Sequence, residues 1–140
     1  MMAVTRLGEG LCVAHLHASA ARPQAEAELI EAARTARDWA AGTSLLLGGD
    51  FNLRPALSPH VFARLAAEFG LRAPTGDRVI DHLFVAGLEI VEPPAQWAPE
   101  RREIPDPTGG GDRRALPIRL SDHAPVEALF ATPGVQAASP

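Results

Sequence analysis

The 140-residue sequence has a single cysteine and lacks both a long apolar run and a signal-like N-terminus. Because Cys12 has no second cysteine to pair with, an intrachain disulfide and a cysteine-based zinc site are both excluded, and we expect a small core residue there. No stretch approaches the roughly 18 uninterrupted apolar residues that a membrane-spanning helix needs. The opening residues MMAVTRLGEG lack the apolar segment of a secretory signal. We therefore expect a soluble intracellular protein, located in the cytoplasm.

The sequence also lacks an excess of basic residues. It has 13 Lys and Arg against 17 Asp and Glu, a formal net charge of −4 and a pI near 5.7. A protein that grips nucleic acid through many phosphates normally shows a basic footprint, and none is seen in this balance. If the protein binds a phosphate, a metal ion or a local patch must therefore supply the positive charge.

What the sequence does contain is the pattern of one globular domain, with 46% apolar and 21% charged residues. Apolar residues recur at helical spacing between Pro23 and Ala41, which predicts an amphipathic helix. The order of strands and helices, with several strands apolar almost throughout, predicts an α/β or α+β fold in which helices are layered on a sheet. The expected strands cover residues 3–7, 11–17, 45–47, 79–85, 88–91 and a last one from about 126, with a second helix at 58–69 and a long irregular loop at 93–117.

The stretch LLLGGDFNLRP combines a buried strand with polar side chains. Its three leucines form a continuous apolar run bounded by glycine, which predicts a short strand covered on both faces. Gly48 and Gly49 allow either a sharp turn or the close approach of another group. Asp50 and Asn52 point to the same side if the backbone stays extended. They indicate either turn chemistry or a site for a cation or a phosphate.

Polar residues recur where other apolar runs end, in VAHLHAS, VIDHL and LSDHAP. Carboxylate, amide and imidazole groups without a thiolate suit Mg²⁺, Mn²⁺ or Ca²⁺ better than zinc. Histidine and aspartate can also act as general acid or base in a hydrolysis. The set comprises His15, His17, Asp50, Asn52, Asp81, Asp122 and His123.

Each member of this set also has a purely structural interpretation. Asp50 could belong to a turn or a helix cap, and Asp122 could cap the turn before the last strand. One of His15 and His17 could be a half-buried strand histidine, and we expect His82, on the opposite face from Asp81, to have no role in the site. One shared site explains the set more economically than several unrelated structural roles, so the residues favour a metal-assisted hydrolase.

The motifs GGDFN, VIDHLFV and LSDHAPV, in this order and at this spacing, resemble the endonuclease/exonuclease/phosphatase superfamily with its DNase I-like fold. VAHLHAS resembles the strand motif of that superfamily that ends in a histidine. The match runs from about residue 4 to residue 131. The resemblance implies half of a DNase I-like β-sandwich, with a mostly antiparallel sheet and helices packed on one side, and a Mg²⁺- or Mn²⁺-dependent phosphodiesterase or nuclease activity.

The resemblance also implies roles for individual residues. Asp50 would orient or deprotonate the attacking water, and Asn52 would stabilise the phosphoryl oxygens. His123 would bind a phosphate oxygen or take the proton of the water. Asp81 would orient a histidine, which we expect to be His17 in preference to His15. Asp122 would either orient His123 or bind the metal together with Asp50 and Asn52, and Asn52 and His15 would contact the substrate. Apart from the resemblance, the phosphate-attracting groups that the sequence offers are arginines, of which we expect Arg54 and Arg113 to bind the substrate; the others are Arg78, Arg101, Arg102 and Arg114.

The resemblance covers the C-terminal half of such a domain, at residues 1–131, followed by a disordered tail at 132–140. The N-terminal half would carry an asparagine and the principal metal-binding glutamate. The exposed sheet face would then meet a separate N-terminal half-domain or a second copy of the chain. The alternative is a non-catalytic interaction module that uses this face, while a structural histidine-metal site is the weakest hypothesis. The substrate stays open between nucleic acid, a phospholipid head group and a small phosphodiester.

Overall fold

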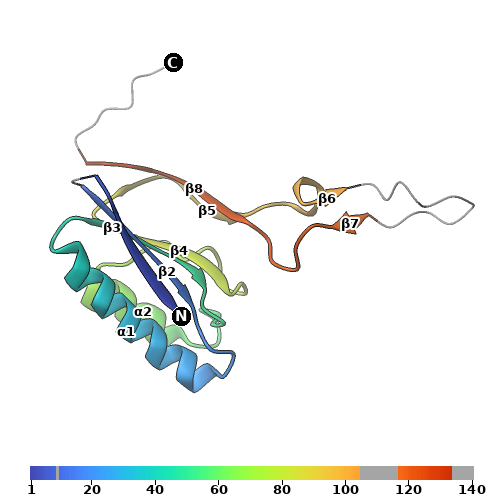
Figure 1. Cartoon of the computed structure of the whole chain (residues 1–140). Helices are drawn as coiled ribbons and strands as arrows, with labels where there is room; N and C mark the ends of the chain where they lie inside the picture. The colour runs from blue at the N-terminus through green and yellow to red at the C-terminus, as the bar shows by residue number, and fades with distance from the viewer. Residues whose placement is uncertain (9, 105–116, 134–140) are drawn as a thin grey trace, which may run out of the picture.

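The computed structural model describes residues 1–8, 10–104 and 117–133 of the chain (Figure 1). Its elements follow one another as strands, a helix, a strand, a second helix and further strands. The helices are α1 (Arg22–Ala40) and α2 (Pro59–Phe69), with a short 3-10 turn η1 (Pro99–Arg101). The strands are β1 (Met2–Leu7), β2 (Leu11–His17), β3 (Ser44–Asp50), β4 (Asp81–Ala86), β5 (Glu89–Gln96), β6 (Glu103–Ile104), β7 (Ile118–Arg119) and β8 (Val126–Ala131).

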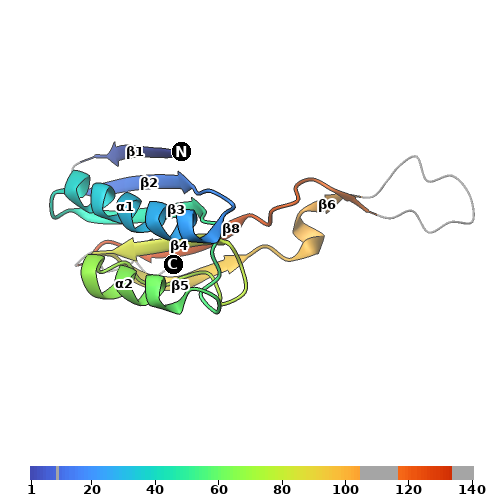
Figure 2. The same cartoon turned by 90° about the horizontal axis from the view of Figure 1, so that it is seen from below.

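The main sheet has the strand order β1-β2-β3-β4, and both helices cover the same face of it (Figures 1 and 2). The β2–β3 pair is parallel because α1 carries the chain back across the sheet, whereas β1–β2 and β3–β4 are antiparallel. The α+β fold class, with a largely antiparallel sheet and helices on one side, is confirmed. Neither helix is long and apolar enough to cross a membrane.

The core lies between this sheet and the helices. Alternate residues of β2, namely Cys12, Ala14 and Leu16, are buried there, as the period of a half-covered strand requires. The predicted helix is confirmed with its start at Arg22, and its buried stripe consists mainly of alanines, which let α1 lie close to the strands. The helix ends at Ala40 and is capped by Ala41, a residue in the left-handed conformation whose N–H donates to the carbonyl of Arg37.

His82 belongs to this core. As expected, it lies on the opposite face of the sheet from Asp81. It is 1% exposed and packs among the rings of Phe51, Phe62 and Phe84. The N–H of Thr75 donates to its Nδ1 at 3.1 Å, and its Nε2 lies 3.1 Å from the carbonyl of Leu53. Burial lowers the pKa of His82, so the imidazole is held neutral with its proton on Nε2.

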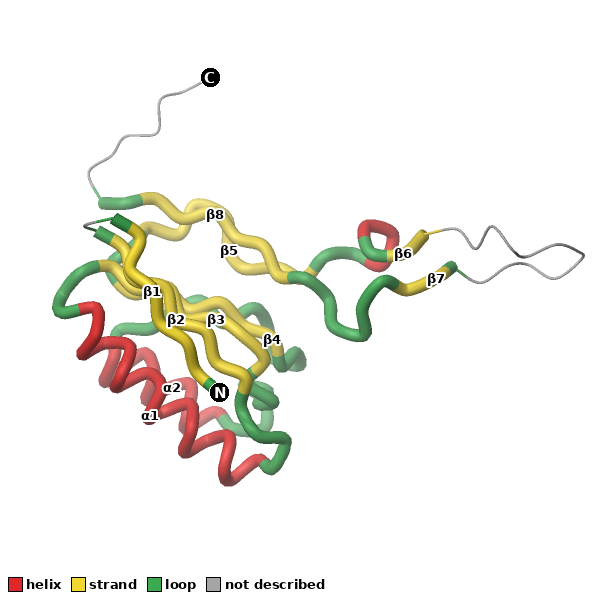
Figure 3. The backbone as a smooth tube through the Cα atoms, viewed as in Figure 1, coloured by secondary structure: helices red, strands yellow, loops and turns green. Residues whose placement is uncertain are grey.

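A ribbon of β5 and β8 lies on the side of the sheet away from the helices, and β6 and β7 pair beyond it (Figure 3). The prediction of an irregular loop at 93–117 was therefore wrong for its described part. Strand β5 continues through Pro93 and Pro94, with register shifts against β8, because a strand without a second neighbour tolerates missing N–H donors. Residues 105–116 and 134–140, and with them most of the predicted tail, lie outside the described residues.

Candidate functional site

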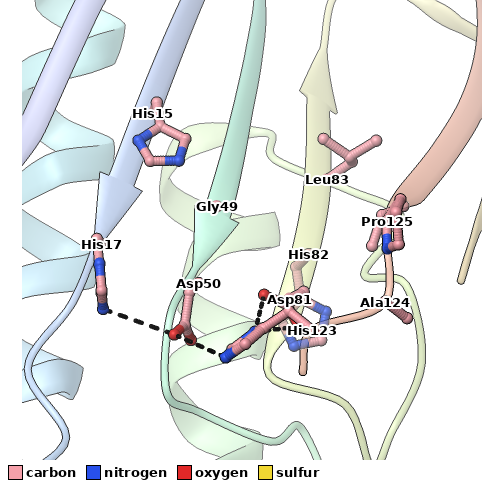
Figure 4. A pocket seen from close by; sticks show the side chains of 11 residues that line it. His15, His17, Gly49, Asp50, Asp81, His82, Leu83, His123, Ala124 and Pro125 are labelled. Carbon is pink, nitrogen blue, oxygen red and sulfur yellow. Dashed lines mark hydrogen bonds and ion pairs between the residues drawn. The ribbon is translucent and has the colours of Figure 1, made fainter. Parts of the chain in front are cut away.

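The register of the main sheet brings three polar side chains into one row. His17 of β2 is the partner of Asp50 in β3, and Asp50 is the partner of Asp81 in β4. Since their neighbours Leu16, Gly49 and His82 lie on the helix side, this row lies on the opposite face, at the end of the sheet (Figure 4). The sheet itself therefore fixes the spacing of an imidazole and two carboxylates.

Of the two alternatives for Gly48 and Gly49, the sharp turn is wrong, because both glycines are part of β3. The structure has the other alternative, a close approach, and the approaching groups belong to the neighbouring strands. Gly49 has φ +141°, and a Cβ there would lie 1.9 Å from the carbonyl oxygen of Leu16 on the neighbouring strand. A Cβ on Gly48 would lie 2.6 Å from the side chain of Leu83. The glycines thus let β3 stay paired up to Asp50.

His123 completes the row from a segment far along the chain, just before β8. Its Nδ1 lies 2.9 Å from Oδ1 and 3.0 Å from Oδ2 of Asp81, and its Nε2 lies 4.0 Å from Oδ2 of Asp50. The hydrogen bond and charge of Asp81 raise the pKa of His123, with smaller contributions from Asp50 and Asp122. The imidazole is partly open to solvent while both carboxylates are mostly covered.

The expected partnership of Asp81 with His17 was wrong, because Asp81 contacts His123 instead. His17 faces the other carboxylate, with its Nε2 at 3.6 Å from Oδ2 of Asp50, and its side chain is 66% exposed. Local sequence patterns could not separate His17 from His123, since His17 ends one apolar strand, His123 precedes another, and both reach the same end of the sheet.

Asp50, Asp81 and His123 form a group that could hold a metal ion. Each offers one ligand atom, and these atoms lie within 4.8 Å of one another. Two carboxylates and an imidazole are suitable ligands for Mg²⁺ or Mn²⁺. Of the metal ligands expected from the sequence, only Asp50 belongs to this group. Asp122 is exposed, and its Oδ1 accepts the backbone N–H of His123 at 3.1 Å.

Asn52 does not share the direction of Asp50, because the backbone leaves the extended conformation there, with φ +51°. Its N–H donates to Oδ1 of Asp50 at 2.9 Å, and its Nδ2 donates to the carbonyl of Ala18 at 2.9 Å. The turn interaction that the sequence offered as one alternative is therefore present at Asp50, on the same carboxylate that belongs to the candidate metal group. Asn52 ties the end of β3 to the end of β2 and holds the carboxylate in place.

Two hollows meet at the pair formed by Asp81 and His123. The first, of about 380 Å³, is also lined by His15, His17 and Asp50. The second, of about 270 Å³, is lined by three arginines from separate segments, all of them among the phosphate-attracting groups expected from the sequence. These are Arg54, which was expected to bind substrate, Arg78 and Arg102, whereas the expected Arg113 lies outside the described residues.

No protein-family model and no curated protein sequence matches the chain. Three solved structures resemble it in fold. A functionally unknown conserved protein from Enterococcus faecalis V583 superposes with a TM-score of 0.61 at 19% identity, over 94% of this chain and 55% of that one. CdtB, the biologically active subunit of cytolethal distending toxin, gives 0.52 at 20% identity, over 94% and 51%. Humanized D. rerio TDP2 gives 0.49 at 17%, over 94% and 57%.

These similarities show the fold, which is DNase I-like. The chain spans about half the length of the solved structures that it matches.

Proposed function

We propose that the chain is a metal-dependent phosphodiester hydrolase of the endonuclease/exonuclease/phosphatase type. The observation that carries this proposal is the convergence of Asp50, Asp81 and His123, one from each of three motifs that resemble that superfamily, on one hollow. A shared fold at 20% identity or less would not support an activity without this convergence.

The carboxylates of Asp50 and Asp81 would hold Mg²⁺ or Mn²⁺, which leaves Nε2 of His123, beside them, for proton transfer. When bound, the ion would neutralise charge on the phosphoryl oxygens and polarise the phosphorus centre. Asp122, exposed next to His123, is a further candidate ligand. Asn52 would support the site through its hydrogen bond to Asp50 and not by contact with the phosphate.

His123 would act as the general base. Its Nδ1–H donates to Asp81, so its Nε2 is left to accept a proton within the hollow. Water attacks phosphorus, the bond from phosphorus to the leaving oxygen breaks, and the proton taken from water returns to that oxygen. His17, with His15 behind it on β2, would bind a phosphate oxygen, or would donate a proton of its own to the leaving oxygen while His123 keeps the proton taken from water.

The experiment is hydrolysis of bis(p-nitrophenyl) phosphate by the purified chain, with Mg²⁺, with Mn²⁺ and with chelator. We expect metal-dependent turnover that His123→Ala and Asp50→Ala nearly abolish while circular dichroism shows an intact fold. His60→Ala is the matched control, because His60 is exposed on α2 and contacts Glu26 instead of the site. Turnover that persists in both site variants would overturn the proposal.

One observation favours a second candidate function, a non-catalytic interaction module. The sheet face opposite the helices carries an apolar row that includes Val13 and Leu46, and Leu7 at its edge is 55% exposed. A separate N-terminal half-domain would cover this face, and self-association is the other outcome to test. Light scattering that finds stable oligomers of a chain with no metal-dependent turnover would support this second function.

A further inference from the structure

Three arginines converge on the hollow that adjoins the proposed reaction centre. Arg54 follows β3, Arg78 precedes β4, and Arg102 follows η1, yet all three line the same space of about 270 Å³. This hollow shares a wall with the larger one, because Asp81 and His123 line both. A group bound among the arginines would therefore lie directly beside a phosphate at the reaction centre.

The segments that carry Arg54 and Arg78 are fixed by backbone hydrogen bonds. The carbonyl of Arg54 accepts the N–H groups of Leu57 at 2.9 Å and Ser58 at 3.0 Å. Ala56 donates to the carbonyl of Asp77 at 3.1 Å, which ties the loop after β3 to the loop before β4. The backbones that carry the two arginines are therefore tied together and do not form independent loops.

Arg102 is held by a second frame. Its neighbour Arg101 lies over the ring of Trp97, with the guanidinium carbon 4.0 Å from the ring centre. Both of these side chains also hydrogen-bond the carboxylate of Glu127 on β8. The backbone of Arg102 accepts a hydrogen bond from Leu120 at 3.0 Å. The arginine is thus positioned by contacts that do not use its own guanidinium group.

The three guanidinium groups have unused donors. Within the described ranges none of them has an ion pair, and Nε of Arg102 is buried without a hydrogen-bond partner. The two carboxylates of the hollow already accept hydrogen bonds, since both Asp81 and Asp122 accept them from His123. Other arginines of this chain do pair with carboxylates, namely Arg34, Arg64, Arg101 and Arg119.

We propose that this arginine hollow binds a second phosphate group of the substrate, next to the phosphodiester that is cleaved. The inference rests on the proposed function, because it takes the larger hollow as the place of the reacting phosphate. The sequence contains arginine and no lysine, and the planar guanidinium group can hold two phosphate oxygens at once. The substrate class is thus a diester that carries another phosphate nearby, as a nucleotide chain or a phosphorylated head group does.

The test measures binding without metal, so that it does not depend on turnover. Thymidine 3′,5′-bisphosphate is compared with thymidine 5′-monophosphate by isothermal titration calorimetry in the presence of a chelator. We expect the bisphosphate to bind on the order of tenfold more tightly, which is the effect of one additional charge-assisted contact. Inositol 1,4-bisphosphate against inositol 1-phosphate forms a second arm, and the arm with the larger preference identifies the source of the second phosphate.

The variants are Arg102→Gln and the double variant Arg54→Gln/Arg78→Gln. Each should reduce the preference for the bisphosphate toward unity. Arg72→Gln is the matched control, since Arg72 is exposed and lines neither hollow, and it should keep the full preference. Equal affinity for one and two phosphates in both arms, or a preference that survives both variants, would overturn the proposal.

A kinetic arm separates this inference from the proposed function. The substrates are thymidine 5′-(p-nitrophenyl phosphate) with and without a 3′-phosphate. Metal-dependent hydrolysis of both with the same KM would leave the hydrolase standing and overturn the second phosphate site. A binding preference that depends on the arginines, in a chain without turnover, would establish the site and overturn the hydrolase.

Discussion

His123 and Asp81 form one hydrogen-bonded pair although 42 residues separate them, with Nδ1 at 2.9 Å from the nearer carboxylate oxygen. The pair joins the segment before β8 to the first residue of β4 and thereby connects the ribbon to the main sheet. It also directs Nε2 of His123 toward Asp50. The chemistry proposed for the site depends on this relationship more than on any other contact.

Asp81→Asn should lower the pKa of His123. The carboxylate favours the protonated imidazole through its hydrogen bond and its charge, and the amide removes the charge. The measurement is an NMR titration of ¹³C-labelled histidine in chelator, with wild type and variant compared peak by peak. An unchanged His123 titration would mean that the pair does not persist in solution.

Asp50→Ala should weaken the binding of Mn²⁺ by at least about tenfold, because it removes one of the carboxylates grouped with His123. Electron paramagnetic resonance of free Mn²⁺ during a titration measures this without any substrate. Asp38→Ala is the control, since Asp38 is an exposed carboxylate of α1 outside this group. Equal affinities in wild type and in Asp50→Ala would remove Asp50 from the metal site.

Gly49→Ala should destabilise the protein far more than Gly48→Ala. A methyl group at Gly49 meets the backbone of Leu16 and sits at a strained φ, which costs at least about 3 kcal/mol. At Gly48 the one atom that it meets too closely is the end of the Leu83 side chain, which can turn away, while the carbonyl oxygen of His82 lies at 3.4 Å, an ordinary contact distance. Urea denaturation of both variants gives the comparison. Similar stabilities would contradict the packing of β2 against β3 described here.

Periodicity in the sequence was sufficient to predict α1, since its buried alanines repeat at helical spacing. It was sufficient for β2 as well, where alternate residues enter the core. The motifs located Asp50 and His123, because each follows or precedes an apolar strand. Local patterns therefore predicted the elements and the residues that end them.

Contacts between distant segments could not be predicted in the same way. The partner of Asp81 depends on where the segment before β8 returns to the sheet, and no local pattern distinguishes His123 from His17. The direction of Asn52 depends on a single left-handed residue. The arginine hollow arises only when three loops meet, so its members have no common spacing in the sequence.

The free energy of unfolding should fall as the pH drops below about 6.5, with His82 as a principal cause. Burial lowers the pKa of His82 in the folded state, and the hydrogen bond that its Nδ1 accepts from the N–H of Thr75 requires the neutral form, whereas the contact with the carbonyl of Leu53 acts weakly in the opposite direction. Below about pH 6.5 the unfolded chain therefore binds one proton more than the folded chain. This difference lowers the free energy of unfolding by up to about 1.4 kcal/mol for each pH unit.

The raised pKa of His123 acts in the opposite direction, so the effect of His82 has to be isolated by comparison with variants. Urea denaturation at pH 7.5 and pH 5.5 should show a smaller loss of stability in His82→Gln than in wild type, while His60→Gln, at an exposed site on α2, behaves like wild type. If His82→Gln does not fold, the NMR titration decides, because the His82 resonance should still be at its neutral position when the pH has fallen below about 6.5, the ordinary pKa of a histidine. A His82 resonance that titrates near 6.5 would show that this imidazole is open to water. That result would contradict its packing among Phe51, Phe62 and Phe84.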